Sequence, residues 1–136
     1  MSNKYYLYGA SGHCKVLIDI IQLKGGSVAK VYDDNPLIDK ILEIEVSDYK
    51  KDEIVGNLVI SIGNNKIRKR ISKTINKDLF CKLIHPNSVI DKSSFIDIGT
   101  VVMAGAVINS WTEIGKHCII NTSSSIDHDC IIEDYV

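Results

Sequence analysis

An aliphatic residue recurs at every sixth position through the second half of the chain. The series is Ile90, Ile96, Val102, Ile108, Ile114, Ile120, Ile126 and Ile132, and a small residue stands four positions after each of the first seven: Ser94, Thr100, Ala106, Thr112, Cys118, Ser124 and Cys130. This period fits neither the repeat of about 2.0 residues in a strand nor that of about 3.6 in a helix. Two inward positions per hexad suit a short strand and a tight corner, and three hexads close one coil. The repeat therefore predicts stacked parallel strands, about two and a half coils high.

The first half of the chain alternates between strand and helix patterns. Apolar runs predict strands over residues 4–8, 27–32, 57–62 and 81–84, and helical spacing predicts helices over 16–23 and 66–76. Residues 41–46 suit a short strand, and residues 47–55 suit a turn or a helix. Such alternation is typical of a parallel sheet with helices on its faces. We therefore expect an α/β, Rossmann-like domain over residues 1–84, followed by a β-helix over residues 85–136.

Composition and charge exclude several classes of protein. Of 136 residues, 45% are hydrophobic and 24% are charged, and 16 basic residues nearly balance 17 acidic ones. This balance lacks the basic excess of a nucleic-acid-binding protein. No apolar run reaches the roughly 18 residues of a membrane helix, and the first strand follows Met1 too closely for a signal peptide. Cys14, Cys81, Cys118 and Cys130 form no CxxC or CxxH pair. We therefore expect a cytoplasmic protein with reduced thiols, without a metal site.

A glycine turn follows the first predicted strand. Gly9 and Gly12 let the backbone approach a ligand, and the helix that starts near Ser11, Gly12 and His13 offers free N–H groups and partial positive charge. This arrangement suits a diphosphate. Leu7 stands where the first glycine of a G-x-G-x-x-G motif would be, which disfavours NAD. A tight turn without a ligand is the alternative.

Polar residues also end the next two strands that we expect to be parallel. Asp33 and Asp34 can accept hydrogen bonds from a ribose or a base edge, although an Asx turn would explain at least one of them. Gly63 and Asn64 follow the strand over residues 57–62, at the sheet edge where α/β proteins bind ligands. The basic run that contains Arg68 is expected to be a solvated helix face.

His128 is the candidate catalytic residue of the repeat half. It lies two positions after the inward Ile126, which predicts an outward-facing corner, and Asp127 and Asp129 flank it. An imidazole can take a proton from an amine or hydroxyl near neutral pH. A neighbouring carboxylate can orient the imidazole and stabilise its charged form. A surface histidine without a catalytic role is the alternative.

Three other residues receive weaker assignments. His85 is expected at the junction of the two halves, and His117 at the surface of a coil. Trp111 stands at an outward repeat position. Because large apolar side chains are rarely left in water, Trp111 suggests a contact between subunits, and a partly covered corner residue is the alternative.

The motifs together resemble one family of enzymes. Tyr8-Gly9-Ala10-Ser11-Gly12-His13, Asp33-Asp34-Asn35-Pro36, Ile62-Gly63-Asn64-Asn65 with Arg68, His85-Pro86, Asn121-Thr122 and Asp127-His128-Asp129-Cys130 follow the order and spacing of NeuD/PglD-type sugar O- and N-acetyltransferases. These proteins are hexapeptide-repeat acyltransferases, with a left-handed β-helix and an N-terminal nucleotide-sugar-binding domain. The resemblance extends over essentially the whole chain.

This resemblance implies an activity and roles for individual residues. The implied reaction moves acetyl from acetyl-CoA to an amino or hydroxyl group of a nucleotide-activated sugar in bacterial glycan synthesis, on a homotrimer and without a metal. His128 would be the general base, Asp129 would assist it, and Asn121 would lie near the acceptor sugar. A UDP-4-amino-sugar is preferred to sialic acid O-acetylation, because a glycine turn followed by acids suits a nucleotide. The residues implied to hold the nucleotide-sugar are Gly9, Ser11, Gly12, His13, Asp33, Asp34, Gly63 and Asn64.

The resemblance also raises the question of length. Members of the family continue for several more coils, and acetyl-CoA lies largely along those later coils, between subunits. Two hypotheses follow for this chain. It is either a C-terminally truncated enzyme, or a non-catalytic module that binds a nucleotide-sugar and trimerises.

Overall fold

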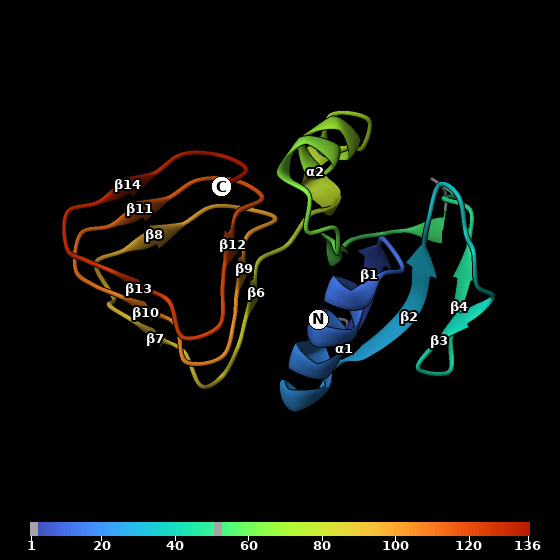
Figure 1. Cartoon of the computed structure of the whole chain (residues 1–136), viewed down its shortest axis with the longest axis horizontal. Helices are drawn as coiled ribbons and strands as arrows, with labels where there is room; N and C mark the ends of the chain where they lie inside the picture. The colour runs from blue at the N-terminus through green and yellow to red at the C-terminus, as the bar shows by residue number, and fades with distance from the viewer. Residues whose placement is uncertain (1–2, 51–52) are drawn as a thin grey trace.

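The computed structural model describes residues 3–50 and 53–136. The first part of this described chain holds a five-stranded sheet in the order β3-β4-β2-β1-β5, with helices beside it (Figure 1). Its elements are β1 (Lys4–Tyr8), α1 (Gly12–Leu23), β2 (Ser27–Tyr32), β3 (Lys40–Ile41), β4 (Ile44–Ser47), β5 (Leu58–Ile60), α2 (Asn65–Ser72) and the 3-10 helix η2 (Lys77–Leu79). β1 pairs in parallel with both β2 and β5, so the Rossmann-like prediction is confirmed.

The second part is a left-handed β-helix of short parallel strands. Its strands are β6 (Leu83–Ile84), β7 (Val89–Ile90), β8 (Phe95–Ile96), β9 (Val101–Val102), β10 (Val107–Ile108), β11 (Glu113–Ile114), β12 (Ile119–Ile120), β13 (Ser125–Ile126) and β14 (Ile131–Ile132). They form three sides, in the orders β12-β9-β6, β13-β10-β7 and β14-β11-β8. This confirms the β-helix that the hexads predict.

The β-helix is longer than the repeat count predicted. Within residues 53–136 each side has three strands, rather than about two and a half coils in all. The added strand is β6, which pairs with β9, whereas the predicted strand over residues 81–84 is assigned to the first half of the chain. Ile84 stands six positions before Ile90, so the hexad series begins one repeat earlier than the residues first counted. The division of the chain at residue 84 stays a prediction.

The aliphatic series lines the interior of the β-helix, as predicted. Ile96, Val102, Ile108, Ile114 and Ile120 are buried, and Ile84, Ile90, Ile126 and Ile132 pack against them. The small residues stand at the corners, and four of their side chains donate to backbone carbonyls of the next coil: Ser94, Thr100, Thr112 and Cys118. Thr100 Oγ1 donates to Gly115 O at 2.7 Å and accepts from Cys118 N at 3.0 Å. Small hydroxyl side chains therefore satisfy corner backbone groups inside the stack.

A left-handed backbone recurs every six residues at the corners. The residues with positive φ are Gly99 (74°), Gly105 (71°), Trp111 (59°), His117 (52°), Ser123 (57°), Asp129 (56°) and Tyr135 (63°). Strand pairing in the stack joins residues eighteen apart, such as Glu113 and Ile131. The corner residues Gly99, His117 and Tyr135 therefore stack in one column, and Trp111 and Asp129 stack in another.

Apolar layers on both faces hold the α/β sheet in place. On one face Leu7 and Val31 pack against Leu17 of α1, and this layer continues into Leu83 of β6. On the other face Tyr32 packs in a layer with side chains of α2 and of the segment after it. Helix α1 thus lies between the sheet and the β12-β9-β6 side of the β-helix (Figure 1).

The predicted strand over residues 41–46 is a hairpin of two strands. β3 and β4 pair antiparallel, and Leu42 and Glu43 form the turn with φ values of 45° and 65°. A period-two pattern does not reveal such a two-residue turn when neither residue is glycine or asparagine. Within the predicted turn or helix over 47–55, residues 51–52 lie outside the described residues.

Helix α2 is shorter than the predicted helix over residues 66–76. It ends at Ser72, and both the backbone N and Oγ1 of Thr74 donate to Ile71 O. Asn76 then caps the N-terminus of η2, where its side chain accepts a hydrogen bond from Asp78 N. Side chains that bond to nearby backbone compete with a continuing helix. In the two described ranges, no helix combines the length and apolar character required to cross a membrane.

Candidate active site

A close contact shapes the glycine turn after β1. Gly9 has a φ of 119°, and a Cβ at this position would lie 2.4 Å from Ile62 Cγ1. Its backbone N donates to Tyr32 O at 2.7 Å, and Ala10 N donates to Asp33 Oδ2 at 2.9 Å. The turn therefore requires glycine at position 9, and it is tied to the end of β2.

The two acids after β2 have different partners. Asp33 uses Oδ1 to accept from Asn35 N at 3.0 Å, which is the Asx turn considered in the sequence, and Oδ2 to hold Ala10. Asp34 is exposed and accepts a hydrogen bond from the Tyr8 hydroxyl. Burial and this bond raise the pKa of Tyr8, so the hydroxyl stays a donor at neutral pH. Asp33 shapes the turn, and Asp34 is the carboxylate at its rim.

The start of α1 is open to solvent. Ser11 is the N-cap residue but its side chain makes no capping bond, and both Ser11 and Gly12 are exposed. His13 is half-buried, and its Nε2 has no hydrogen-bond partner among the described residues. Burial and the charge of Arg68 lower the pKa of His13. The helix start therefore presents backbone N–H groups, next to an imidazole that is neutral at neutral pH.

The segment between β5 and the end of α2 differs from the sequence prediction in the burial of Arg68. Gly63 and Asn64 are exposed, and Asn64 caps α2 by accepting from Ile67 N at 3.0 Å. The basic run was expected to be solvated, but Arg68 is only 1% exposed. Arg68 stands three positions before the buried Ile71, so it shares the buried stripe of α2. That spacing is the signal in the sequence for the burial of Arg68.

A small pocket joins several of these residues. It has a volume of about 190 Å³ and is lined by Tyr8, Gly9, Asp33, Asp34, Asn35, Ile62, Ile67, Arg70 and Ile71. The structure thus brings the Gly9 turn and both acids together with a cation, Arg70. The other predicted nucleotide residues, Ser11, Gly12, His13, Gly63 and Asn64, are not part of this lining.

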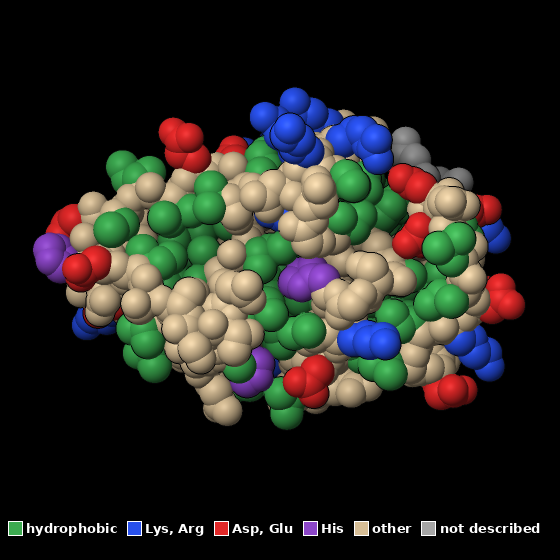
Figure 2. Space-filling model, viewed as in Figure 1, with side chains coloured by type: hydrophobic (Ala, Val, Ile, Leu, Met, Phe, Trp, Pro, Cys, Tyr) green, Lys and Arg blue, Asp and Glu red, His purple; other side chains and the backbone are tan. Residues whose placement is uncertain are grey.

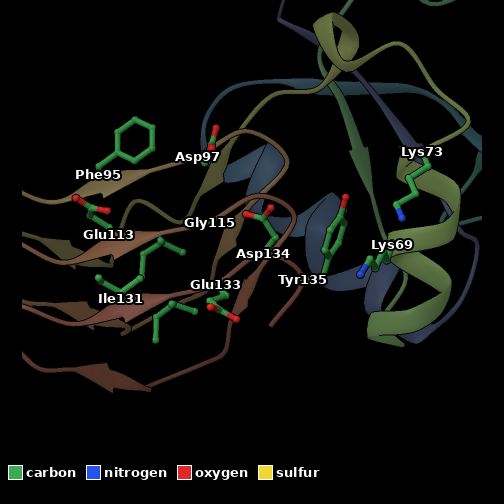
Figure 3. A pocket seen from close by; sticks show the side chains of 12 residues that line it. Lys69, Lys73, Phe95, Asp97, Glu113, Gly115, Ile131, Glu133, Asp134 and Tyr135 are labelled. Atoms are coloured by element: carbon green, nitrogen blue, oxygen red, sulfur yellow. The ribbon is translucent and has the colours of Figure 1, made fainter.

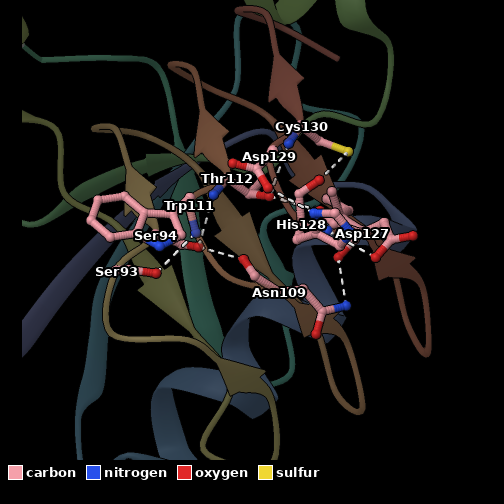
Figure 4. Close-up of polar contacts among 10 residues, drawn as sticks. Ser93, Ser94, Asn109, Trp111, Thr112, Asp127, His128, Asp129 and Cys130 are labelled. Atoms are coloured by element: carbon pink, nitrogen blue, oxygen red, sulfur yellow. Dashed lines mark hydrogen bonds and ion pairs between the residues drawn. The ribbon is translucent and has the colours of Figure 1, made fainter.

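His128 lies on an exposed corner between β13 and β14 (Figure 4). Its Nδ1 lies 2.7 Å from Asp129 Oδ2, and its backbone N donates to Asp127 Oδ1 at 2.9 Å. The hydrogen bond to Asp129 and the charges of both acids raise the pKa of His128. The bond to Asp129 favours a proton on Nδ1 and leaves Nε2 as an acceptor. Within the described residues, Nε2 makes no hydrogen bond.

Trp111, the predicted subunit contact, and Asn121, the residue implied to lie near the acceptor sugar, stand on different corners of the β-helix. Trp111 is 70% exposed and stands one coil from Asp129 on the same corner, as Figure 4 shows. Asn121 follows β12, so it occupies the corner before β13 rather than the His128 corner. Its side chain accepts from Thr122 N at 2.9 Å. Within one chain, Asn121 and His128 therefore lie on different corners of the third coil.

The small pocket is lined by residues of the α/β part, and the His128 corner lies at the end of the β-helix farthest from that part. The corner between β13 and β14 is at the far left of Figure 1, whereas the β12-β9-β6 side faces α1. A groove of about 700 Å³ lies between α2 and the β14-β11-β8 side (Figure 3). Lys69 of α2 and Lys73, which directly follows α2, line this groove opposite the exposed Phe95 and Ile131.

His117 contradicts its predicted surface position. It is 3% exposed, and its ring stacks parallel to Tyr135 at 5.6 Å and edge-on to Phe80 at 4.5 Å. Burial lowers the pKa of His117 to about 4, so it is neutral at pH 7. The cause is the packing of Phe80 and of Arg68 from α2 on this corner, which a repeat count does not reveal. His85 follows β6, where its Nδ1 accepts from Asn87 N at 2.9 Å.

Across the described ranges, no group of three or more His, Cys, Asp or Glu side chains is arranged to hold a metal ion.

Comparison with known proteins identifies relatives of both parts of the chain. Residues 4–75 match the model of the PglD N-terminal domain. The chain is 31% identical, over 148 aligned residues, to a GDP-perosamine N-acetyltransferase of Escherichia coli O157:H7, an alignment that covers 98% of this chain and 66% of the relative. It is 44% identical over 48 residues to a UDP-N-acetylbacillosamine N-acetyltransferase of Bacillus subtilis (strain 168), covering 34% of this chain and 22% of the relative. The chain thus spans just under two thirds of the relative that it matches throughout.

The solved structures that are similar to this chain also come from acetyltransferases. A histidine-to-asparagine mutant of perosamine N-acetyltransferase from Caulobacter crescentus, in complex with CoA and GDP-perosamine, superposes with a TM-score of 0.89 at 28% identity. The match covers 97% of this chain and 66% of that one. The acetyltransferase domain of PglB from Neisseria gonorrhoeae FA1090 has the same fold, with a TM-score of 0.83 at 24% identity over 98% of this chain and 69% of that one.

Proposed function

We propose, because the chain belongs to the family of NeuD/PglD-type sugar acetyltransferases, that it transfers acetyl from acetyl-CoA to an amino group of a nucleotide-activated sugar. The observation that carries the proposal is the hydrogen-bonded pair of His128 and Asp129 on an exposed corner of the β-helix. The pair supplies a general base, and the chain also carries a PglD N-terminal domain with a pocket at the expected strand ends. A bacterial cytoplasm would supply both substrates.

The pocket after β1 and β2 would hold the nucleotide. Asp34 offers an exposed carboxylate to a ribose or base, and Arg70 offers a cation to a phosphate. The nucleotide of the acceptor sugar is UDP, as the sequence predicts, or GDP. GDP is included because the relative aligned along 98% of this chain is a GDP-perosamine N-acetyltransferase. The substrate class is thus a nucleoside-diphosphate amino sugar.

His128 would act as the base that receives the amine proton. Acetyl-CoA, when bound, supplies an activated thioester. The proton would pass from the acceptor amine to His128 Nε2 while the amine nitrogen bonds to the acetyl carbon. The sulfur would leave with the electron pair of its bond, and the proton on Nε2 can then neutralise it. Asp129 would hold the ring by Nδ1 and stabilise the charged imidazole.

A second copy of the chain would complete this site. The nucleotide pocket lies in the α/β part and the His128 corner lies at the end of the β-helix farthest from it, so one chain does not bring them together (Figure 1). Two features support contact between copies in a homotrimer. The corner exposes Asp127, Asp129 and Trp111, whereas Lys and Arg side chains gather over α2 in Figure 2. Opposite charges and an exposed aromatic residue suit such an interface.

Turnover assays test the proposal directly. The purified chain is mixed with acetyl-CoA and either a GDP-linked or a UDP-linked amino sugar, and release of the CoA thiol is followed against a control without acceptor. We expect thiol release with at least one of the two sugars. Acetylation of sialic acid alone would support the O-acetyltransferase alternative. Nucleotide-sugar binding without any thiol release would support the non-catalytic module.

Replacing Asp129 with asparagine is expected to move the acidic limb of the pH profile to lower pH. Asp129 raises the pKa of His128 by stabilising the imidazolium, so its neutral replacement lets the base deprotonate at a lower pH. Asparagine tolerates the positive φ of 56° at this position. We expect plateau kcat/KM to fall about 10-fold to 100-fold, part of the roughly 10²–10⁴-fold that a general base supplies. Kinetics between pH 5 and pH 9 measure both effects.

Asp127→Asn is the matched control for this prediction. Asp127 bonds to the backbone of His128 and not to its ring, so its replacement should move the limb in the same direction but less. An unchanged profile in Asp129→Asn, or a larger shift in Asp127→Asn, would contradict the role given to Asp129.

Replacing Asp34 with alanine is expected to weaken nucleotide binding roughly 10-fold or more. Hydrogen bonds to charged groups contribute about 1.5–3 kcal/mol, and each 1.4 kcal/mol or so is tenfold in affinity. Isothermal titration calorimetry with GDP and UDP measures this change. Asp19→Ala is the control, because Asp19 is exposed on α1 and does not line the pocket. Equal affinities for the two variants would remove Asp34 from the nucleotide site.

A further inference from the structure

Arg68 is a buried cation whose partners are neutral oxygen atoms. Within the described residues its guanidinium makes five hydrogen bonds and no ion pair: Nε to His117 O at 2.6 Å, Nη1 to Ile62 O at 3.0 Å and Gly63 O at 3.2 Å, and Nη2 to Asn65 Oδ1 at 2.7 Å and Tyr135 O at 3.3 Å. Arginine has five N–H donors, so the bonds match its full capacity. The side chain is therefore held in one position.

One set of these bonds reaches the edge of the nucleotide pocket. Ile62 and Gly63 follow β5, and both carbonyls accept from Nη1. Ile62 lines the pocket, and its side chain fills the space where Gly9 lacks a Cβ. A shift of the Ile62 peptide would therefore press on the Gly9 turn or open the floor of the pocket.

The other set of bonds reaches the β-helix. His117 and Tyr135 occupy equivalent corners of successive coils, and the backbone carbonyl of each accepts from Arg68. The corner column is well packed, because His117 is buried and stacks on Tyr135. Arg68 thus joins a loop at the pocket to a rigid part of the β-helix.

We propose that Arg68 is a positioning residue for the nucleotide, which fixes the Ile62–Gly63 edge against the Gly9 turn by anchoring it to the β-helix. The inference rests on the proposed function, because it assumes that the pocket holds a nucleoside diphosphate. Arg68 does not line that pocket, so it acts through the backbone that it holds. With no carboxylate paired to it among the described residues, its positive charge also favours an anionic ligand nearby.

Lysine cannot reproduce this arrangement. Its ammonium group has three donors on one atom, whereas the five acceptors around Arg68 are reached by three nitrogens of a planar group. Lysine keeps the charge and part of the bonding, and methionine keeps neither. Lysine should therefore weaken the link between the Ile62–Gly63 edge and the β-helix in part, and methionine should remove it.

Calorimetric titration of the whole chain with GDP and with UDP tests the proposal. We expect Arg68→Met to weaken nucleotide binding at least tenfold, and Arg68→Lys to give an intermediate affinity. Tyr135→Phe is the matched control. It removes the 2.9 Å contact between Tyr135 Oη and Ser72 Oγ, which also joins the β-helix to α2, but it leaves the carbonyl that Arg68 uses. We expect its affinity to stay within threefold of the unmodified chain.

Each outcome of this test has a distinct meaning. A folded Arg68→Met variant that binds within threefold of the unmodified chain would overturn the inference. An equal loss of nucleotide affinity in Tyr135→Phe would overturn it too. In that case any weakened contact between α2 and the β-helix would lower the affinity, and Arg68 would have no special role. Circular dichroism checks folding, and if Arg68→Met fails to fold, full affinity in Arg68→Lys overturns the inference. Binding of neither nucleotide by the unmodified chain would overturn the proposed nucleotide site and this inference with it.

Discussion

Replacing His128 with alanine is expected to lower kcat for acetyl transfer by about 10²–10⁴-fold, the range that a general base supplies. The imidazole stands on an exposed corner and packs against no core, so the fold should be unaffected. The proposed nucleotide pocket is lined by residues of the α/β sheet and of α2, and the β-helix lies between these elements and the His128 corner. A change in kcat without a change in the dissociation constant for GDP or UDP is therefore the expected signature.

Lys92→Ala provides the control for this prediction. Lys92 occupies the corresponding corner position two coils away and is exposed like His128. It should leave kcat within about twofold, because surface substitutions away from a site have small effects. Thermal denaturation of both variants would show whether stability has changed. A His128→Ala variant that retains kcat within threefold of the unmodified chain would remove His128 as the base.

Much of the fold follows from repeated local rules in the sequence. Inward aliphatic residues of the hexads meet equivalent side chains one coil away, as Ile108 meets Ile90 on one side and Ile126 on the other. Every repeat is under the same packing constraint, so the six-residue spacing is enough to predict the β-helix. The strand β6 was misplaced because it stands where the two patterns meet.

Only part of the candidate site follows from local patterns in the sequence. The Gly9 turn and the acids after β2 were predictable, because both lie at the carboxyl ends of neighbouring parallel strands. The burial of Arg68 and His117 was not predicted, since it results from packing between α2 and β-helix corners far away in the sequence. The spacing of Arg68 relative to Ile71 gave a signal, but a charged residue on an apolar stripe is ordinarily assigned to solvent. The roles of His128 and Asn121 stay predictions.

Replacing Gly99 with alanine is expected to destabilise the protein by roughly 2–5 kcal/mol. A Cβ there would lie 2.2 Å from His117 Nδ1, and the φ of 74° is itself unfavourable for alanine. The backbone conformation contributes about 1–2 kcal/mol, and overpacking a closed site contributes about 1–3 kcal/mol. The His117 ring cannot move aside, because it is packed by Phe80 and Tyr135. Urea denaturation at pH 7 would measure the loss in the free energy of unfolding.

Gly105→Ala separates the backbone effect from the overpacking. Gly105 has a φ of 71°, but a Cβ there would meet Ser123 Oγ at 3.1 Å and no atom closer. We expect Gly105→Ala to lower the free energy of unfolding only by the backbone contribution of about 1–2 kcal/mol. Equal losses for the two glycine variants would contradict the clash with His117.

A double variant tests the cause of the Gly99 effect and links it to the site. His117→Ala removes the ring that a Cβ at position 99 would strike, so adding Gly99→Ala to it should cost no more than Gly105→Ala does. The same clash would displace His117 O, to which Arg68 Nε donates at 2.6 Å. Gly99→Ala alone should therefore also weaken nucleotide binding in the protein that remains folded, whereas Gly105→Ala should not. An unchanged affinity in folded Gly99→Ala would mean that this corner does not control the Ile62–Gly63 edge.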